Sequence, residues 1–148
     1  MSLQQNIDQD IKSAMLSKDS SRLRGLRAIK AALLVAKTEK GAELVTEDTE
    51  IKVLQRLVKQ RKESAEIYQT QNRQDLYQIE LEELQVIEAY LPKQMDKDEI
   101  NAHISAVIKQ TGAVGMKDMG KVMGIVNKDL AGKADGKTIS ELVKALLA

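Results

Sequence analysis

Residues 46–90 read TEDTEIKVLQRLVKQRKESAEIYQTQNRQDLYQIELEELQVIEAY, and this stretch decides the fold. Its apolar residues recur every three or four positions in two runs, the first within residues 51–68 and the second within 76–91, which is the period of an amphipathic helix. Thr46 and Asn72 are residue types that cap helix N-termini, and Leu91-Pro92 ends the second run. The stretch therefore predicts a helical hairpin.

Three charged residues interrupt the apolar stripes of this hairpin. Arg61 lies in the middle of the first stripe, and Glu80 and Glu83 lie centrally in the second. Folding the hairpin about residue 71 brings position 61 alongside position 81, so we expect a semi-buried ion pair between Arg61 and Glu80 or Glu83. Such a pair inside a packing surface can fix the register of two helices. A catalytic or ligand-binding role for these residues is the alternative interpretation.

Helical periodicity continues on both sides of the hairpin, and no run alternates for long enough to form a sheet. Ser2 to Gln5 reads as a capping box that opens a first helix, and a second helix begins at about residue 19 and ends at Gly41. The sequence therefore predicts an all-α protein.

The single proline marks a predicted domain boundary. Pro92 stops the helical run, and a capping box at Asp96 then starts a new element. We expect an N-terminal helical domain over residues 1–94 and a small three-helix domain over residues 95–148. Its helices are expected at residues 97–110, 117–130 and 138–147, the last opened by Thr138.

Composition excludes several classes of site. The 148 residues include no cysteine and one histidine, so the chain has no disulfide, thiol nucleophile or thiolate metal site. Residues 131–138 come close to a phosphate-binding loop, but Ala131 replaces its first glycine and no strand precedes it. We expect no metal, no cofactor and no catalytic residue. No apolar run approaches 18 residues and no leader is apparent, so a soluble cytoplasmic protein is expected.

A row of lysines follows Gly112. At about 100° per residue, Lys117, Lys121 and Lys128 fall within an arc of roughly 60° that also holds Gly124, with the methionines and valines opposite. Glycine within a helix is about 1 kcal/mol less favourable than alanine. The presence of Gly124 therefore suggests that a ligand or another helix comes close to the backbone there. A solvated face is the ordinary explanation, but two further lysines extend the row toward a helix N-terminus, which favours an anion. The predicted phosphate-binding residues are Lys117, Gly120, Lys121, Gly124, Lys128, Lys133 and Lys137.

Six segments carry a resemblance to a known family. They are KQRKES at residues 59–64, EAYLP at 88–92, Gly112-Ala113, MGKVM at 119–123, LAGKADGK at 130–137, and Leu142-Val143. Together they resemble the YqeY-like family over essentially the whole chain.

This resemblance implies two helical domains, the second similar to the tail of GatB, the B subunit of the glutamine-dependent amidotransferase that acts on misacylated tRNA. That tail contacts tRNA, and a similar domain supports tRNA binding in some glutaminyl-tRNA synthetases. The family is accordingly associated with carbon–nitrogen ligases that use glutamine as amide donor. This chain corresponds to the tail region, and no counterpart of the larger catalytic portion is expected.

Three hypotheses follow. The leading one is a non-catalytic module that binds structured RNA, above all tRNA, through the lysine row; with no Phe and no Trp, contacts to phosphates must dominate. A second is an accessory component that works with an amidotransferase or an aminoacyl-tRNA synthetase. A third is a protein-interaction adaptor that uses the mixed-charge face of the hairpin, formed by Lys52, Arg56, Lys59, Glu63 and Glu66.

Overall fold

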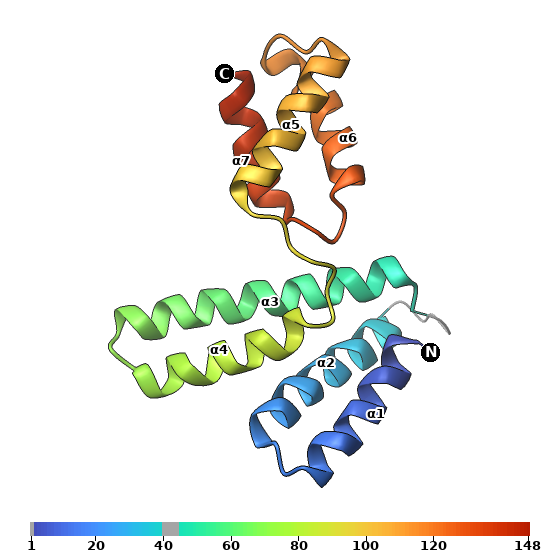
Figure 1. Ribbon diagram of the computed structural model, residues 1–148, viewed down its shortest axis with the longest axis vertical. Coiled ribbons are helices and arrows are strands. Elements are labelled where there is room, and N and C mark those ends of the chain that lie inside the picture. Colours follow the sequence, from blue (N-terminus) through green and yellow to red (C-terminus); the bar gives the residue numbers. More distant parts are fainter. Residues whose placement is uncertain (1, 40–44) are drawn as a thin grey trace. The chain divides into compact units, whose positions relative to one another are not determined.

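The computed structural model describes residues 2–39 and 45–148, and every element of regular secondary structure within them is a helix, as predicted (Figure 1). Gly41, the expected end of the second helix, lies outside the described residues. The elements are α1 (Leu3–Leu16), α2 (Ser20–Glu39), α3 (Glu47–Thr70), α4 (Gln74–Glu88), α5 (Lys97–Thr111), the 3₁₀ helix η1 (Met116–Asp118), α6 (Met119–Asp129) and α7 (Gly136–Leu147).

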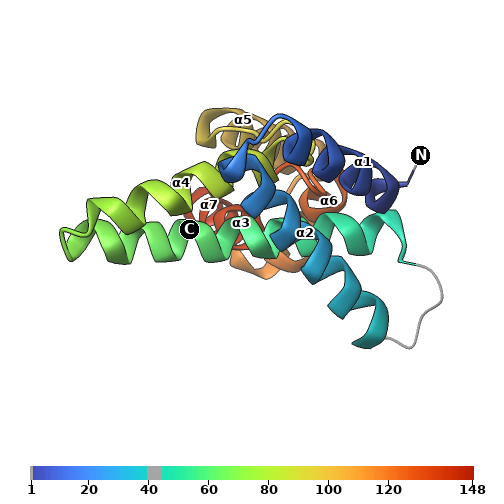
Figure 2. The same cartoon turned by 90° about the horizontal axis from the view of Figure 1, so that it is seen from below.

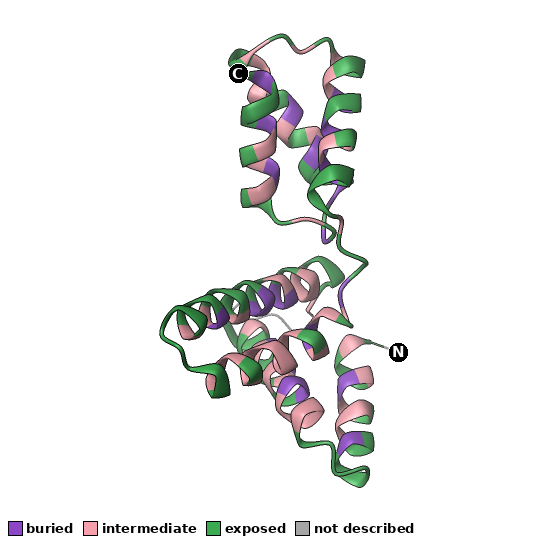
Figure 3. Ribbon diagram, turned by 60° about the vertical axis from the view of Figure 1, so that its left-hand side comes forward, coloured by how far each residue is buried: buried purple, intermediate pink, exposed green. Residues whose placement is uncertain are grey.

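The helices form two compact units, Met1–Leu91 and Pro92–Ala148, here called the N-terminal and C-terminal units. In the N-terminal unit, α3 and α4 lie side by side as a hairpin, and α1 and α2 pack beside each other (Figures 1 and 2). Within each unit, the buried residues lie on the sides of the helices that face the other helices of that unit (Figure 3). The N-terminal core consists of Ile7, Ala14, Leu26, Ile29, Leu33, Val53, Leu54, Leu57, Val58, Ile87 and Leu91.

The structure confirms the predicted helix caps at Ser2 and Thr46 but not the one at Asn72. Ser2 forms the predicted capping box with Gln5, and Thr46 accepts a hydrogen bond from the N–H of Thr49, as an N-cap does. The predicted cap at Asn72 is wrong. That residue has a φ of 57° and forms the left-handed turn between α3 and α4, so α4 begins two residues later without a side-chain cap.

Gly25 of α2 marks a close approach to α4 that no sequence pattern predicts. A Cβ atom built on Gly25 would lie 2.7 Å from Cβ and 2.8 Å from Cγ1 of Val86. Val86 is β-branched and has little freedom to move its Cβ or rotate away. Glycine therefore sets the distance at which α2 packs on α4.

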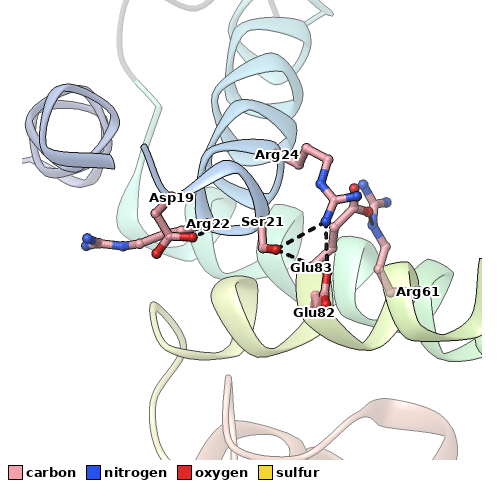
Figure 4. A network of polar contacts seen from close by, with 7 residues as sticks. All are labelled: Asp19, Ser21, Arg22, Arg24, Arg61, Glu82 and Glu83. Atoms are coloured by element: carbon pink, nitrogen blue, oxygen red, sulfur yellow. Dashed lines mark hydrogen bonds and ion pairs between the residues drawn. The ribbon is translucent and has the colours of Figure 1, made fainter. Parts of the chain in front are cut away.

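Ion pairs connect α4 to both of its neighbours (Figure 4). The Nε of Arg61 on α3 donates to Glu83 at 3.2 Å and lies 4.0 Å from Glu80, with all three side chains less than a fifth exposed. On the other side, Arg24 of α2 donates to Glu82 at 2.8 Å, and Ser21 shares that carboxylate. Burial, together with the nearby Glu83 carboxylate, raises the pKa of Glu80 above its ordinary value.

Tyr90 joins the end of the hairpin to α1. Its hydroxyl donates a hydrogen bond to Asp10, whose other oxygen lies 3.8 Å from Arg22 of α2. Burial and the adjoining Asp10 carboxylate raise the pKa of Tyr90 to about 12. The tyrosine of the EAYLP segment thus has a structural partner 80 residues away in the sequence.

In the C-terminal unit, α5, α6 and α7 pack around one apolar core. The sequence predicted its second helix at residues 117–130, but Lys117 belongs to η1 and α6 starts at Met119. The reason is local: Gly115 is fully extended, and Asp118 bonds back to the preceding loop rather than continuing a helix. The core residues are Ile100, Ile104, Val107, Val122, Val126, Leu130, Ile139, Val143 and Leu147.

Replacing Gly25 by alanine should destabilise the protein, although alanine is the better helix former. We expect Gly25→Ala to lower the free energy of unfolding by about 1–3 kcal/mol, because the new Cβ overlaps Val86 and the two helices must separate. Urea titration followed by circular dichroism measures the change. Gly124→Ala is the matched control: its Cβ meets nothing within 4 Å, so it should stabilise by about 1 kcal/mol. A Gly25→Ala protein as stable as wild type would contradict the packing described.

The Tyr90 hydroxyl should make a pH-dependent contribution to stability. Tyr90→Phe is expected to cost about 1 kcal/mol near neutral pH, because the hydrogen bond to Asp10 is lost. The folded pKa lies above the ordinary value of 10, so the hydroxyl's contribution is fully present below pH 10 and is lost as the pH rises toward 12. The difference between wild type and variant, measured by urea unfolding from pH 8 to 11, should therefore shrink above pH 10. A difference that grows with pH would disprove this assignment.

Candidate functional site

The predicted phosphate-binding lysines come from four successive pieces of the C-terminal unit, and we call them the lysine row. All five are exposed, and none has a carboxylate of a described residue within the 4 Å of an ion pair. Their positions are η1 for Lys117, α6 for Lys121 and Lys128, the turn after α6 for Lys133, and the first turn of α7 for Lys137.

Helix α6 holds the centre of the row because its opposite side is buried. Val122 and Val126 are fully buried, which turns the other side of the helix to solvent. Lys121 and Lys128 are seven residues apart, so they lie about 20° apart around the helix and about 10 Å apart along it. Lys117 precedes the helix and is therefore not part of the 60° arc that the sequence suggested.

Two glycines lie beside these lysines, and the fold does not need either of them. Gly120 and Gly124 are exposed, and a Cβ atom built on either would meet nothing within 4 Å. The alternative that another helix of the chain packs against Gly124 is therefore excluded for the described residues. The glycines leave bare backbone on the lysine-bearing surface, which is where a ligand could approach closely.

The three aspartates of residues 109–137 are engaged elsewhere. Asp118 accepts a hydrogen bond from the N–H of Val114 at 3.0 Å, and Asp129 lies 3.0 Å from Nε2 of His103. Asp135 accepts from the N–H of Thr138 at 2.6 Å. Because each carboxylate faces a local partner, the ammonium groups of the row remain available to an external anion.

The N-terminus of α7 differs from its prediction. The helix begins at Gly136 with Asp135 as N-cap, and not at Thr138, because the extended backbone of Asp135 lets its carboxylate reach back to the third amide. A carboxylate thus already supplies negative charge at this helix end. The helix end adds less to anion binding than the sequence indicated, and the lysine side chains must supply most of the attraction.

The turn that carries Lys133 is fixed by a segment the sequence did not single out. The amide of Gln94 donates to the carbonyl of Gly132 at 2.7 Å, and the N–H of Met95 donates to the carbonyl of Lys133 at 2.9 Å. Gly132 adopts a φ of 78°, a conformation that favours glycine. No sequence motif signals these contacts, which depend on tertiary packing.

Other kinds of site find little support in the described part of the chain. No group of three or more His, Asp or Glu side chains there could hold a metal ion, and no described helix is long and apolar enough to cross a membrane. An open groove between α2 and α4 is lined by Arg22, Glu82 and Tyr90 among others, and these three side chains already bond to neighbours within the unit.

Comparisons with known proteins give one consistent result. A family model described as Yqey-like protein matches residues 4–147. The chain is also similar to proteins named altered inheritance of mitochondria protein 41, mitochondrial. The relative from Meyerozyma guilliermondii is 32% identical over 151 residues, covering 95% of this chain and 74% of the relative. The relative from Clavispora lusitaniae is 32% identical over 119 residues, covering 68% of this chain and 69% of the relative. The relative from Pyrenophora tritici-repentis is 28% identical over 143 residues, covering 93% and 77%.

Proposed function

The chain belongs to the YqeY-like family, and from that premise we propose that it is a non-catalytic module that binds structured RNA, specifically tRNA. The observation that carries the proposal is the lysine row: five exposed ammonium groups without an ion-pair partner among the described residues. The resemblance of this unit to the tRNA-contacting tail of GatB selects tRNA among polyanions.

The chemistry of the surface determines how such binding would work. Lysine side chains donate to phosphate oxygens as flexible point charges, so they position the protein on the RNA without reading its sequence. Gly120 and Gly124 allow the sugar–phosphate backbone to approach the helix. Affinity should therefore vary little between tRNA species and should fall steeply with salt, because each phosphate contact releases counterions.

A tRNA-binding module can also deliver its ligand to an enzyme. Kinship to the amidotransferase subunit makes an accessory role in amide transfer on misacylated tRNA the second candidate. Adding this chain to a transamidation reaction would then raise its rate. The cytoplasm stays the proposed compartment for this chain, while the names of the relatives assign those proteins to mitochondria.

Reversing two charges of the lysine row tests the proposal. We expect Lys121→Glu with Lys128→Glu to weaken tRNA binding at least tenfold in low salt, and to reduce the slope of log affinity against log salt by roughly 1.4–1.8 for two lost phosphate contacts. Fluorescence anisotropy with labelled tRNA over a salt series measures both quantities.

The matched control changes net charge equally in the other unit. Lys12 and Lys37 are exposed and have no ion-pair partner among the described residues, so Lys12→Glu with Lys37→Glu should leave affinity within about threefold of wild type. Absence of tRNA binding by the wild-type protein in low salt would refute the proposal. Equal losses in the two variants would also refute the assignment to this surface.

A further inference from the structure

The loop between α5 and η1 exposes two apolar side chains at one end of the lysine row. Val114 is 78% exposed and Met116 is 44% exposed. Between them lies Gly115, and the next residue after Met116 is Lys117, the first lysine of the row. We call Val114 and Met116 the apolar tip.

The apolar tip is held by hydrogen bonds at both ends of the loop. Gly112 ends α5 in the left-handed conformation, and the N–H of Ala113 donates to the carbonyl of Ile108 at 3.3 Å. Beyond it, the N–H of Val114 donates to Asp118, and the N–H of Asp118 donates to the carbonyl of Gly115 at 3.0 Å. An ordered loop thus holds Val114 in solvent, so little conformational freedom remains to be lost on binding.

The fold itself does not explain this arrangement. Ala113 packs against the core of the unit, whereas the following Val114 is exposed. Gly115 is extended, a conformation open to any residue, and a Cβ atom built on it would meet nothing within 4 Å. Exposed valine and methionine beside bare backbone are therefore free to contact a ligand.

The neighbouring charge indicates what kind of ligand. A partner that meets this surface must present anionic groups to Lys117 and Lys121 and an apolar surface to the tip. RNA does both where its bases are unstacked, whereas a continuous duplex hides the faces of its bases. Methionine is among the apolar side chains that pack against base faces in nucleic-acid complexes, where in a duplex the bases must first be unstacked at a cost.

We propose that Val114 and Met116 pack against unstacked bases of the RNA whose phosphates bind the lysine row. This inference rests on the proposed function and adds to it a class of preferred ligand: RNA with accessible loop bases, in preference to uninterrupted duplex. The lysines supply affinity for any RNA, and the apolar tip supplies selectivity for loops.

The test separates the apolar contribution from the ionic one. We expect Val114→Ser with Met116→Ser to lower affinity for tRNA about 5–30-fold, since burial of apolar surface is lost, while the slope of log affinity against log salt stays unchanged. Affinity for a fully paired RNA duplex of similar length should not change. Wild type should therefore prefer tRNA over duplex, and the variant should lose that preference.

Two controls guard the interpretation. Leu34 and Val35 of α2 are also exposed, so Leu34→Ser with Val35→Ser makes the same chemical change in the other unit and should leave tRNA affinity unchanged. Met116→Leu keeps the apolar character and should bind as wild type does. Circular dichroism checks that each variant is folded.

The outcomes distinguish this inference from the proposed function. If the lysine variant loses binding while the serine variant keeps both affinity and preference for tRNA, the lysine row binds RNA and the apolar tip does not contact bases. If the apolar tip binds a protein partner, and the serine variant still binds RNA as the wild type does, the inference is overturned in the same way. If the wild-type protein binds no tRNA in low salt, the proposed function itself fails.

Discussion

Helix α4 shows the constraint on which the charge distribution of this protein depends: each of its carboxylates is matched by a cation nearby. Glu80 and Glu83 face Arg61, and the remaining pairs are Asp75 with Arg73, Glu82 with Arg24 and Glu88 with Lys62. Glu80 and Glu83 are the least exposed of these carboxylates, and removal of Arg61 would leave their charge without compensation. Such a loss costs more free energy than an exposed ion pair contributes. Four of these carboxylates, Glu80, Glu82, Glu83 and Glu88, thus pair α4 with its neighbours α2 and α3.

The C-terminal unit places its carboxylates differently, and that difference leaves the lysine row without ion-pair partners in the part of the chain that the structure describes. Asp96 and Asp135 cap helices, and Asp118 fixes the loop before α6. A carboxylate that accepts backbone N–H groups stabilises a helix or turn without a lysine partner. Two units with nearly balanced composition therefore present different surfaces, and the overall charge of +1 conceals a row of lysines that pair with no carboxylate of residues 2–39 or 45–148.

The sequence predicted what depends on periodicity and local chemistry. Apolar spacing predicts the helical class, and the caps at Ser2 and Thr46 are predictable because their bonding partners lie three residues away in the sequence. The exact start of α6, the approach of Gly25 to Val86 and the Gln94 contact to the turn of Lys133 were not foreseen. Each depends on backbone geometry or on partners distant in sequence, which no spacing rule encodes. The RNA-binding assignment of the lysine row stays a prediction.

The C-terminal unit also carries features that do not help it to fold alone. Gly124 within α6 costs about 1 kcal/mol relative to alanine, although no described residue lies within 4 Å of a Cβ atom built on it. The neighbouring lysines have no ion-pair partner among the described residues, and Val114 is exposed to water in a loop that is held by hydrogen bonds. In a domain this small, where net stability is only several kcal/mol, the cost of the glycine alone is a sizeable fraction. A polyanion with apolar faces would pair with the lysines and cover the exposed side chains, so ligand binding would stabilise the unit through residues that add little to its stability when free.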